Sequence, residues 1–478
     1  MVASFLIFLA IFVAVGVSSV LKSRGTKKDY YLASSSVSPA LVGLSAVATN
    51  NSGYMFIGVI GYTYATGLAA IWIMLGWLAG DFIASTFIHA KLRKSTQSTK
   101  EVSFAGVLSN WTGEQYIYLQ RLVALISLVF LLAYAGAQLV AGSKALHVLL
   151  GWPSATGAII GAILVVLYCI AGGIRASIWT DAAQSVVMII AMAMLLIVAL
   201  VEKGGISASL AQMNQIEGFM DWTPDDLVVP GILGGFVFAI SWGFAGFSVI
   251  GQPHIMVRFM TLEDNNKMLT ARIYYYIWFS LFYAMATIVG MLARIYLVDT
   301  ASFDAELALP TMAKELLPGM LAGVILAGIF AATMSTADSL VLSCSAAVTH
   351  DLIPHKIEKP WLLKVFTVLI TAAALKWALL DTQSVFNLVI LAWSGLASAF
   401  APLLIVLCLG MRPGQPLSII AVLTGLFTAL MWRYMGWQSA AYEGMAGMIA
   451  GLSVLLVGSF ILKQVSSQAS PQVSRVNS

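Results

Sequence analysis

Long apolar segments alternate with short polar ones along almost the whole chain of 478 residues. Each apolar segment has about 20 residues or more, the length that a helix needs to cross the hydrocarbon core of a bilayer. Barrel strands would instead alternate apolar and polar residues over about 10 positions. The pattern therefore predicts an all-α polytopic membrane protein with about 13 transmembrane helices, at residues 3–21, 38–65, 69–91, 119–148, 154–173, 178–202, 228–250, 271–297, 316–349, 362–380, 384–408, 415–435 and 440–463.

Charged residues lie mostly between these segments and indicate how the chain crosses the membrane. Only 10% of the residues are charged and 60% are hydrophobic, whereas soluble domains carry about 25% charged residues. Lysine and arginine concentrate in alternate loops, whose members include Lys22, Lys28, Lys94, Arg175 and Arg258. Because such loops stay in the cytoplasm, we expect a bacterial inner-membrane protein with its N-terminus outside and its C-terminus inside. The lipid bilayer is then a partner, and no segment indicates binding to nucleic acid.

The second predicted span is interrupted by polar residues near its middle. Its sequence SAVATNNSGYMFIG (45–58) places two amides, a hydroxyl and a glycine at residues 50–53, between apolar flanks. A helix broken at membrane depth persists only where it is buried in protein or lines a wet cavity. Gly53 permits such a break, and the amides and Ser52 can bond the freed backbone groups. The alternative is a polar seam that joins two neighbouring helices.

A second interrupted span lies five helices later. Its sequence FAISWGFAGFSVIGQPHIMVRF (238–259) contains Gly243, Gly246 and Gly251 shortly before Pro253. Two interrupted spans at matching positions predict a transporter built from two inverted repeats, with its binding site at the midplane. The predicted units are 1–37, the first helix and a cytoplasmic loop; 38–202 and 203–408, the two repeats; 409–463, two additional helices; and 464–478, a disordered cytoplasmic tail.

Polar residues also share one face of the ninth span. Ser335, Asp338 and Ser339 stand at positions i, i+3 and i+4, with Thr336 beside them. Hydroxyl and carboxylate oxygens suit a small hard cation, and an intramembrane carboxylate indicates a functional site. Hydroxyl bonding to the preceding helical turn is the alternative. Asp181, near the inner end of the sixth span, is a second candidate carboxylate, or a group that stabilises the start of its helix.

Four motifs resemble those of the sodium:solute symporter family, most closely its sodium/proline symporter branch. They are WTDAAQS (179–185), GQPHIMVRFM (251–260), MSTADS (334–339) and LAWSGLASAFAPLL (391–404). The resemblance covers the chain from the first span to about residue 460. It implies a five-plus-five inverted-repeat core whose two repeats each begin with a broken helix, in agreement with the pattern above.

The resemblance also implies three groups of site residues. The main sodium site would use the backbone carbonyls of Ala48, Asn51 and Ala332 and the hydroxyls of Ser335 and Thr336. A second ion site, which only some members have, would use Asp181, Ser335, Asp338 and Ser339. The substrate pocket would use Asn50, Ser52, Gly53, Tyr134 and Trp242, with Phe247 as the nearest match to a further aromatic residue.

The chain departs from the proline branch at the expected substrate pocket. Asn50 stands where the proline transporters carry an acidic residue. The stretch between Trp242 and Gln252 is about three residues longer than in that branch. These departures affect the residues expected to select the solute, whereas they leave the sodium-binding motifs intact.

The sequence thus predicts a sodium-coupled secondary active symporter that imports a small organic solute by alternating access. An amino acid such as proline is the expected solute, with pantothenate or a short-chain carboxylate as the alternative. Na+ is the coupling ion; no enzyme activity or cofactor is expected, because the sequence shows neither a nucleophile–base pair nor metal-ligand spacing. A passive channel would carry solute without sodium. A membrane sensor domain is the other rival, but residues 464–478 are too few for a signalling kinase.

Overall fold

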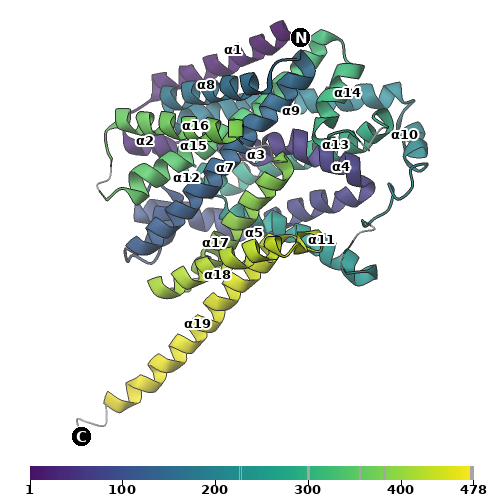
Figure 1. Cartoon of the computed structure of the whole chain (residues 1–478). Coiled ribbons are helices and arrows are strands. Elements are labelled where there is room, and N and C mark those ends of the chain that lie inside the picture. The colour runs from purple at the N-terminus through teal and green to yellow at the C-terminus, as the bar shows by residue number, and fades with distance from the viewer. Residues whose placement is uncertain (225–226, 228, 299–301, 355–356, 381–383, 474–478) are drawn as a thin grey trace.

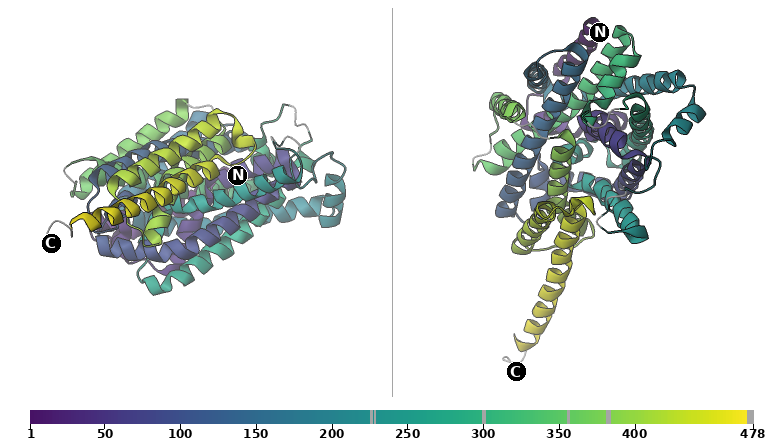
Figure 2. Two further views of the ribbon diagram at one scale, coloured as in Figure 1. Left: turned by 90° about the horizontal axis from the view of Figure 1, so that it is seen from below. Right: turned by 45° about the vertical axis from the view of Figure 1, so that its right-hand side comes forward.

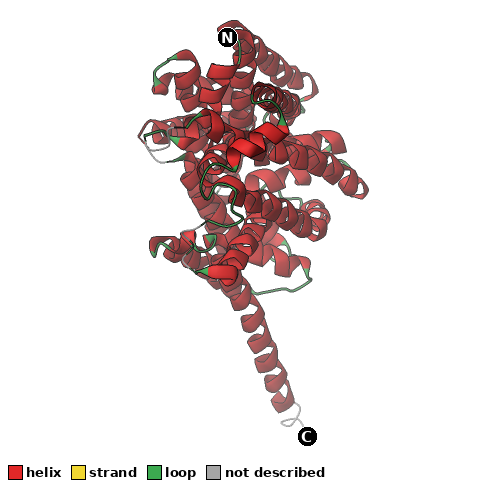
Figure 3. Ribbon diagram, turned by 90° about the vertical axis from the view of Figure 1, so that its right-hand side faces the viewer, coloured by secondary structure: helices red, strands yellow, loops and turns green. Residues whose placement is uncertain are grey.

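Helices form almost all of the structure, a computed structural model that describes every residue except 225–226, 228, 299–301, 355–356, 381–383 and 474–478. In the described part, the β-structure is one isolated bridge between Val37 and Leu262 (Figure 3). The long helices are α1 (Val2–Ser18), α3 (Pro39–Gly53), α5 (Ile71–Thr99), α7 (Ile117–Leu150), α8 (Ser154–Gly172), α9 (Ile174–Glu202), α11 (Gly231–Phe247), α13 (Met268–Tyr296), α15 (Gly319–Ala346), α16 (Pro360–Leu380), α17 (Val385–Cys408), α18 (Gln415–Tyr434) and α19 (Glu443–Val473). The short helices are α2 (Lys27–Leu32), α4 (Ile60–Thr66), α6 (Phe104–Asn110), α10 (Ile206–Met213), α12 (Pro253–Met260) and α14 (Ala308–Leu316).

The described helices account for the predicted membrane crossings. Twelve helical stretches among the described residues are long and apolar enough to span a bilayer. One of them, Pro39–Thr99, has 61 residues, which is about 90 Å of helix at 1.5 Å per residue and far exceeds one crossing. It turns at Gly67, whose φ of +74° ends α4, so it contains two crossings. Eleven single stretches and this double one make thirteen.

Helix α15 lies at the centre of the bundle. It packs against α3, α7 and α9, and nearly all of its residues from Ala322 to Ala346 are buried. Helices α18 and α19 pack against α17 at one side, and α19 then extends away from the rest of the protein (Figures 1 and 2). The bundle therefore surrounds α15, the helix on which the sequence places the candidate sodium ligands.

The last helix extends beyond the predicted last span. Helix α19 continues to Val473, whereas the sequence analysis expects a disordered tail from residue 464. Residues 464–470 contain neither Gly nor Pro, the two residues that most strongly disfavour a helix, so the helix of the last span can continue through them. Residues 474–478 of the predicted tail lie outside the described part.

A buried ion pair fixes the first polar loop to the core. The Nη2 of Arg175, at the start of α9, donates to Asp29 Oδ1 of α2 at 2.7 Å and to the carbonyl of Ala33 at 2.8 Å. Ala33, Ser34 and Ser35 all have positive φ angles, which are unfavourable for residues with a Cβ. The bonds from Arg175 hold this strained turn in place.

We expect Asp29→Asn to lower the thermal stability of the purified protein at neutral pH. Breaking a buried ion pair costs about 3–5 kcal/mol, whereas Glu263→Gln breaks an exposed pair with Lys267 and serves as the control. Burial raises the pKa of Asp29, but hydrogen bonds from the Arg24 amide, Arg175 and Ser34 outweigh it and bring the pKa below its ordinary value of 3.8. The stabilisation is therefore complete above the unfolded pKa and is lost as the pH falls through the folded one. Below the folded pKa of Asp29, wild type and variant should therefore melt at the same temperature. A difference in melting temperature that persists there would contradict the stabilising role of the Asp29 carboxylate.

Candidate functional site

The first helix break lies at Ser52, as the polar residues of this span predict. Ser52 has φ +28° and ψ 178°, and the helix continues beyond it as a π-helical turn, Tyr54–Val59, and then as α4. Side chains satisfy the freed backbone groups: Gly53 N–H donates to Gln138 Oε1 at 2.8 Å, and Tyr54 N–H donates to Ser52 Oγ at 3.0 Å. The hydroxyl of Tyr134 also donates to Ser52 Oγ, at 3.1 Å. The structure thus brings Ser52, Gly53 and Tyr134 together and adds Gln138, which the sequence analysis did not select.

The two asparagines that precede the break bond to groups away from it. Asn51 Nδ2 donates to the carbonyl of Val47, one turn earlier, at 2.9 Å. Asn50 Nδ2 donates to the hydroxyl of Tyr275 on α13, which in turn donates to Asp81 Oδ2 on α5 at 2.6 Å. Neither amide therefore bonds the freed backbone as the sequence analysis expects. Asp81 is fully buried inside a span, and its isolated charge there was a signal that could have identified it.

The second break lies later in its span than its first glycines suggest. Helix α11 continues through Gly243 and Gly246, then tightens into a 3₁₀ turn at Ser248–Gly251 before α12. A Cβ on Gly246 would approach the carbonyl of Trp77 to 2.3 Å, so this glycine allows close packing of α11 on α5. At the break, Gln252 Nε2 donates to the carbonyls of Ser248 at 3.1 Å and Trp393 at 3.0 Å.

Oxygen atoms of α3 and α15 converge beside the first break. Ser335 Oγ donates to the carbonyls of Ala48 and Ala332, each at 3.1 Å. Thr336 Oγ1 donates to the carbonyls of Thr49 at 2.9 Å and Ala332 at 3.2 Å. Four of the five residues predicted for the main sodium site thus supply neighbouring oxygens. Thr49, which the sequence analysis did not select, supplies another.

A fully buried arginine occupies the position predicted for a second ion site. Nη2 of Arg258, on α12, lies 3.3 Å from Asp181 Oδ2 and 3.7 Å from Asp338 Oδ1, and it donates to the hydroxyls of Ser177 and Ser339. We call these four side chains, Ser177, Asp181, Asp338 and Ser339, the oxygen cage. The hydroxyl of Ser335 bonds instead to the carbonyls of Ala48 and Ala332, among the oxygens predicted for the main sodium site. The sequence analysis treats Arg258 only as a loop charge, because it follows the end of a predicted span.

Thr49 joins the oxygens predicted for the main sodium site to the oxygen cage. Its carbonyl accepts from Thr336, and its own hydroxyl lies 3.1 Å from Ser339 Oγ and 3.3 Å from the carbonyl of Ser335. One residue of α3 therefore contacts both groups of oxygens.

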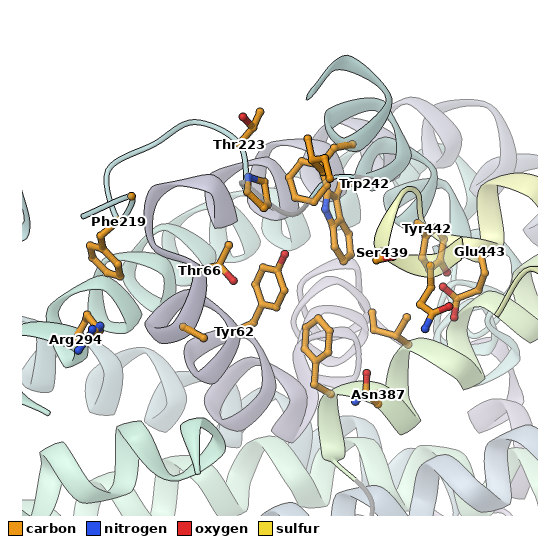
Figure 4. A pocket seen from close by; sticks show the side chains of 18 of the residues that line it. Tyr62, Thr66, Phe219, Thr223, Trp242, Arg294, Asn387, Ser439, Tyr442 and Glu443 are labelled. Atoms are coloured by element: carbon orange, nitrogen blue, oxygen red, sulfur yellow. The ribbon is translucent and has the colours of Figure 1, made fainter. Parts of the chain in front are cut away.

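A cavity of about 550 Å³ opens on the predicted outer side of the bundle. Figure 4 shows Tyr62 of α4 and Trp242 of α11 pointing into it, with Tyr442 next to Trp242, their rings stacked at 6.2 Å, and Glu443 beyond Tyr442. The rings of Tyr62 and Phe386 stack at 5.1 Å, and Phe386 also stacks on Tyr54 at 5.4 Å. Tyr62, Trp242 and Phe386 therefore line the cavity, and the stack continues from Phe386 to Tyr54, two residues after Ser52. Phe247 packs against Phe244 and is not among the cavity-lining residues.

Comparison with known proteins agrees with this arrangement of helices. The sequence profile of the sodium:solute symporter family matches residues 30–412. The chain is 28% identical to the sodium/proline symporter of Escherichia coli, with 93% of this chain and 90% of that protein covered. It is 29% identical to the high-affinity proline transporter PutP of Bacillus subtilis, with 94% and 95% covered.

Two solved structures share the fold at low sequence identity. One is a Na+-coupled sialic acid symporter in a substrate-bound, outward-open state, with a TM-score of 0.81, 18% identity and coverage of 96% of this chain and 97% of that one. The other is a nucleobase-cation-symport-1 family transporter in a closed conformation, with a TM-score of 0.58, 14% identity and coverage of 91% and 95%.

Proposed function

Because this chain belongs to the sodium:solute symporter family, we propose that it couples inward sodium movement to the uptake of a small zwitterionic amino acid, with proline as the first candidate. The observation that carries the proposal is the convergence of the Ser335 and Thr336 hydroxyls on carbonyls of the broken helix α3. These oxygens suit Na+, and they lie directly beside the residues that would meet a solute. The proline-transporting relatives direct the choice of solute.

The first break offers groups that fit a carboxylate. The helical segment Tyr54–Thr66 begins directly after Gly53. The N–H of Gly53 donates to the Gln138 side chain, and the N–H of Tyr54 donates to the Ser52 hydroxyl. Such N–H groups at a helix start favour an anion. A carboxylate that replaces the Gln138 and Ser52 side chains would then be bound by amide dipoles.

The cavity supplies an entry path from the predicted outer side. Arg433, on its wall, pairs with Glu443 at 2.7 Å, so the wall carries both charges that a zwitterion can meet. Tyr62, Trp242 and Phe386 add flat apolar surfaces for a small ring. We propose that the solute passes these rings to reach Ser52 and Tyr134.

We expect Trp242→Ala to raise the solute concentration for half-maximal uptake roughly tenfold, because the cavity loses an aromatic wall. Aromatic contacts contribute about 0.5–1.5 kcal/mol in addition to the free energy of burying the ring. Na+ binding should stay measurable, since the main sodium site lies elsewhere. Trp361, which is 60% exposed, gives a matched control as Trp361→Ala. Equal loss of solute affinity in both variants would remove Trp242 from the solute path.

Uptake in proteoliposomes tests the proposed function directly. Labelled proline, pantothenate and a short-chain carboxylate are each offered with an inward sodium gradient and with the gradient dissipated. We expect gradient-dependent accumulation of proline and weaker competition by its methyl ester. Accumulation of pantothenate or the carboxylate alone would replace the proposed solute, and flux without a sodium requirement would favour a channel.

A further inference from the structure

One nitrogen of Arg258 lies where a second cation would bind. Its Nη2 has four oxygen neighbours from two helices, Ser177 and Asp181 of α9 and Asp338 and Ser339 of α15. All four residues of the oxygen cage are buried, and Arg258 has no exposed surface. This donor set of hard oxygens is the kind that a small hard cation takes.

The rest of the guanidinium is poorly bound. Arg258 Nε and Nη1 have no hydrogen-bond partner among the described residues, and neither does Asp338 Oδ2. An arginine that serves only as a structural ion pair usually presents its planar fork to a carboxylate through two parallel bonds. Here a single nitrogen enters the cage, as a point charge would.

A small cavity beside Arg258 lies toward the predicted cytoplasmic side. A cavity of about 30 Å³ borders Arg258 and Ser339 and extends to Ser103 and Asp351. This volume is about that of one water molecule. Arg258 therefore contacts the oxygen cage and borders this inner cavity, as does Ser339 of the cage.

We propose that Arg258 is a tethered cation that takes the place of a second sodium ion in the oxygen cage. The side chain is held within reach of the cage at an effective concentration that free Na+ does not match, and it neutralises one of the two carboxylates. The chain then binds one Na+, at the main sodium site. This inference rests on the proposed sodium coupling and specifies its stoichiometry.

The test counts bound sodium in the full-length purified protein, with ²²Na+ as the probe and no solute present. We expect one Na+ per chain for wild type and two for Arg258→Gln, since the variant leaves the cage to Na+. The double variant with Arg258→Gln and Asp338→Asn should return to one. Arg93→Gln removes another buried arginine, which donates to the carbonyl of Leu262, and should leave the count at one.

Two further variants keep the proposal testable if Arg258→Gln does not fold. Arg258→Lys keeps a cation near the cage and should bind one Na+, and Asp338→Asn in the wild-type background should do the same, because Arg258 already fills the cage. In uptake, the Hill coefficient for Na+ should rise from about 1 in wild type to about 2 in Arg258→Gln, a change that loss of a purely structural ion pair does not produce.

The outcomes separate this inference from the proposed function. Two sodium ions bound to wild type would overturn the role of Arg258 while leaving sodium coupling intact. A folded Arg258→Gln protein that still binds one Na+ would also overturn it. Wild type that binds no Na+ would contradict the proposed function as well.

Discussion

Replacing Ser335 and Thr336 together by alanine is expected to raise the sodium concentration for half-maximal uptake roughly 30-fold or more, since each lost buried oxygen contact costs about 1–3 kcal/mol. The two hydroxyls reach carbonyls of both α3 and α15, so no other side chain of the site replaces them. The measurement is a sodium titration of solute uptake at a fixed solute concentration.

The control for this variant removes a hydroxyl far from the site. Ser418 is buried on α18 and donates to the carbonyl of Gly414, one turn earlier. Ser418→Ala should leave the sodium titration unchanged. If the double variant also titrates like wild type, the main sodium site does not lie between α3 and α15.

Gly53→Ala is expected to reduce uptake by roughly 5- to 150-fold, because overpacking a close contact costs about 1–3 kcal/mol. A Cβ at this position would lie 2.6 Å from Thr333 Cγ2 and 2.9 Å from Ala141 Cβ. It would also approach Gln138, the side chain that holds the Gly53 N–H. The measurement is the initial rate of sodium-driven uptake.

A second substitution tests the reason for this loss. Thr333→Ser removes the methyl group nearest to the added Cβ, and its hydroxyl can keep the bond to the carbonyl of Phe330. In combination with Gly53→Ala it should restore part of the uptake. Gly243→Ala is the control in the other broken span, since its Cβ would meet no atom within 4 Å. Full uptake by Gly53→Ala alone would show that the first break tolerates a larger residue.

The sequence was informative where a local signal stood out against an apolar background. The spans follow from hydrophobic length alone, and the break at Ser52 follows from polar residues in the middle of one span. The same reasoning should have selected Asp81, a carboxylate within an otherwise apolar stretch of α5. Glycine spacing predicts the break in the seventh span but does not distinguish Gly246, which packs on α5, from the actual turn at Ser248–Gly251.

Partners contributed by distant helices could not be predicted from the sequence. Asn50 binds Tyr275, which is 225 residues away, and nothing near either residue indicates the contact. Hydropathy ends the predicted span before Arg258 and so predicts a cytoplasmic loop position, yet α12 directs Arg258 into the bundle against Asp181 and Asp338. Hydropathy assigns a residue by its neighbours in sequence, whereas burial depends on the direction of the helix after a break.

Thr49 couples the proposed main sodium site to the oxygen cage. Its carbonyl meets Thr336 and its hydroxyl meets Ser339, so a shift of this one residue alters both sites together. Thermodynamic linkage is reciprocal. If bound Na+ stabilises the Arg258 guanidinium in the oxygen cage by some free energy, the guanidinium in the cage stabilises bound Na+ by the same amount. Thr49→Val, which keeps the carbonyl and removes the hydroxyl, would then change sodium affinity without removing any oxygen that Thr336 contacts.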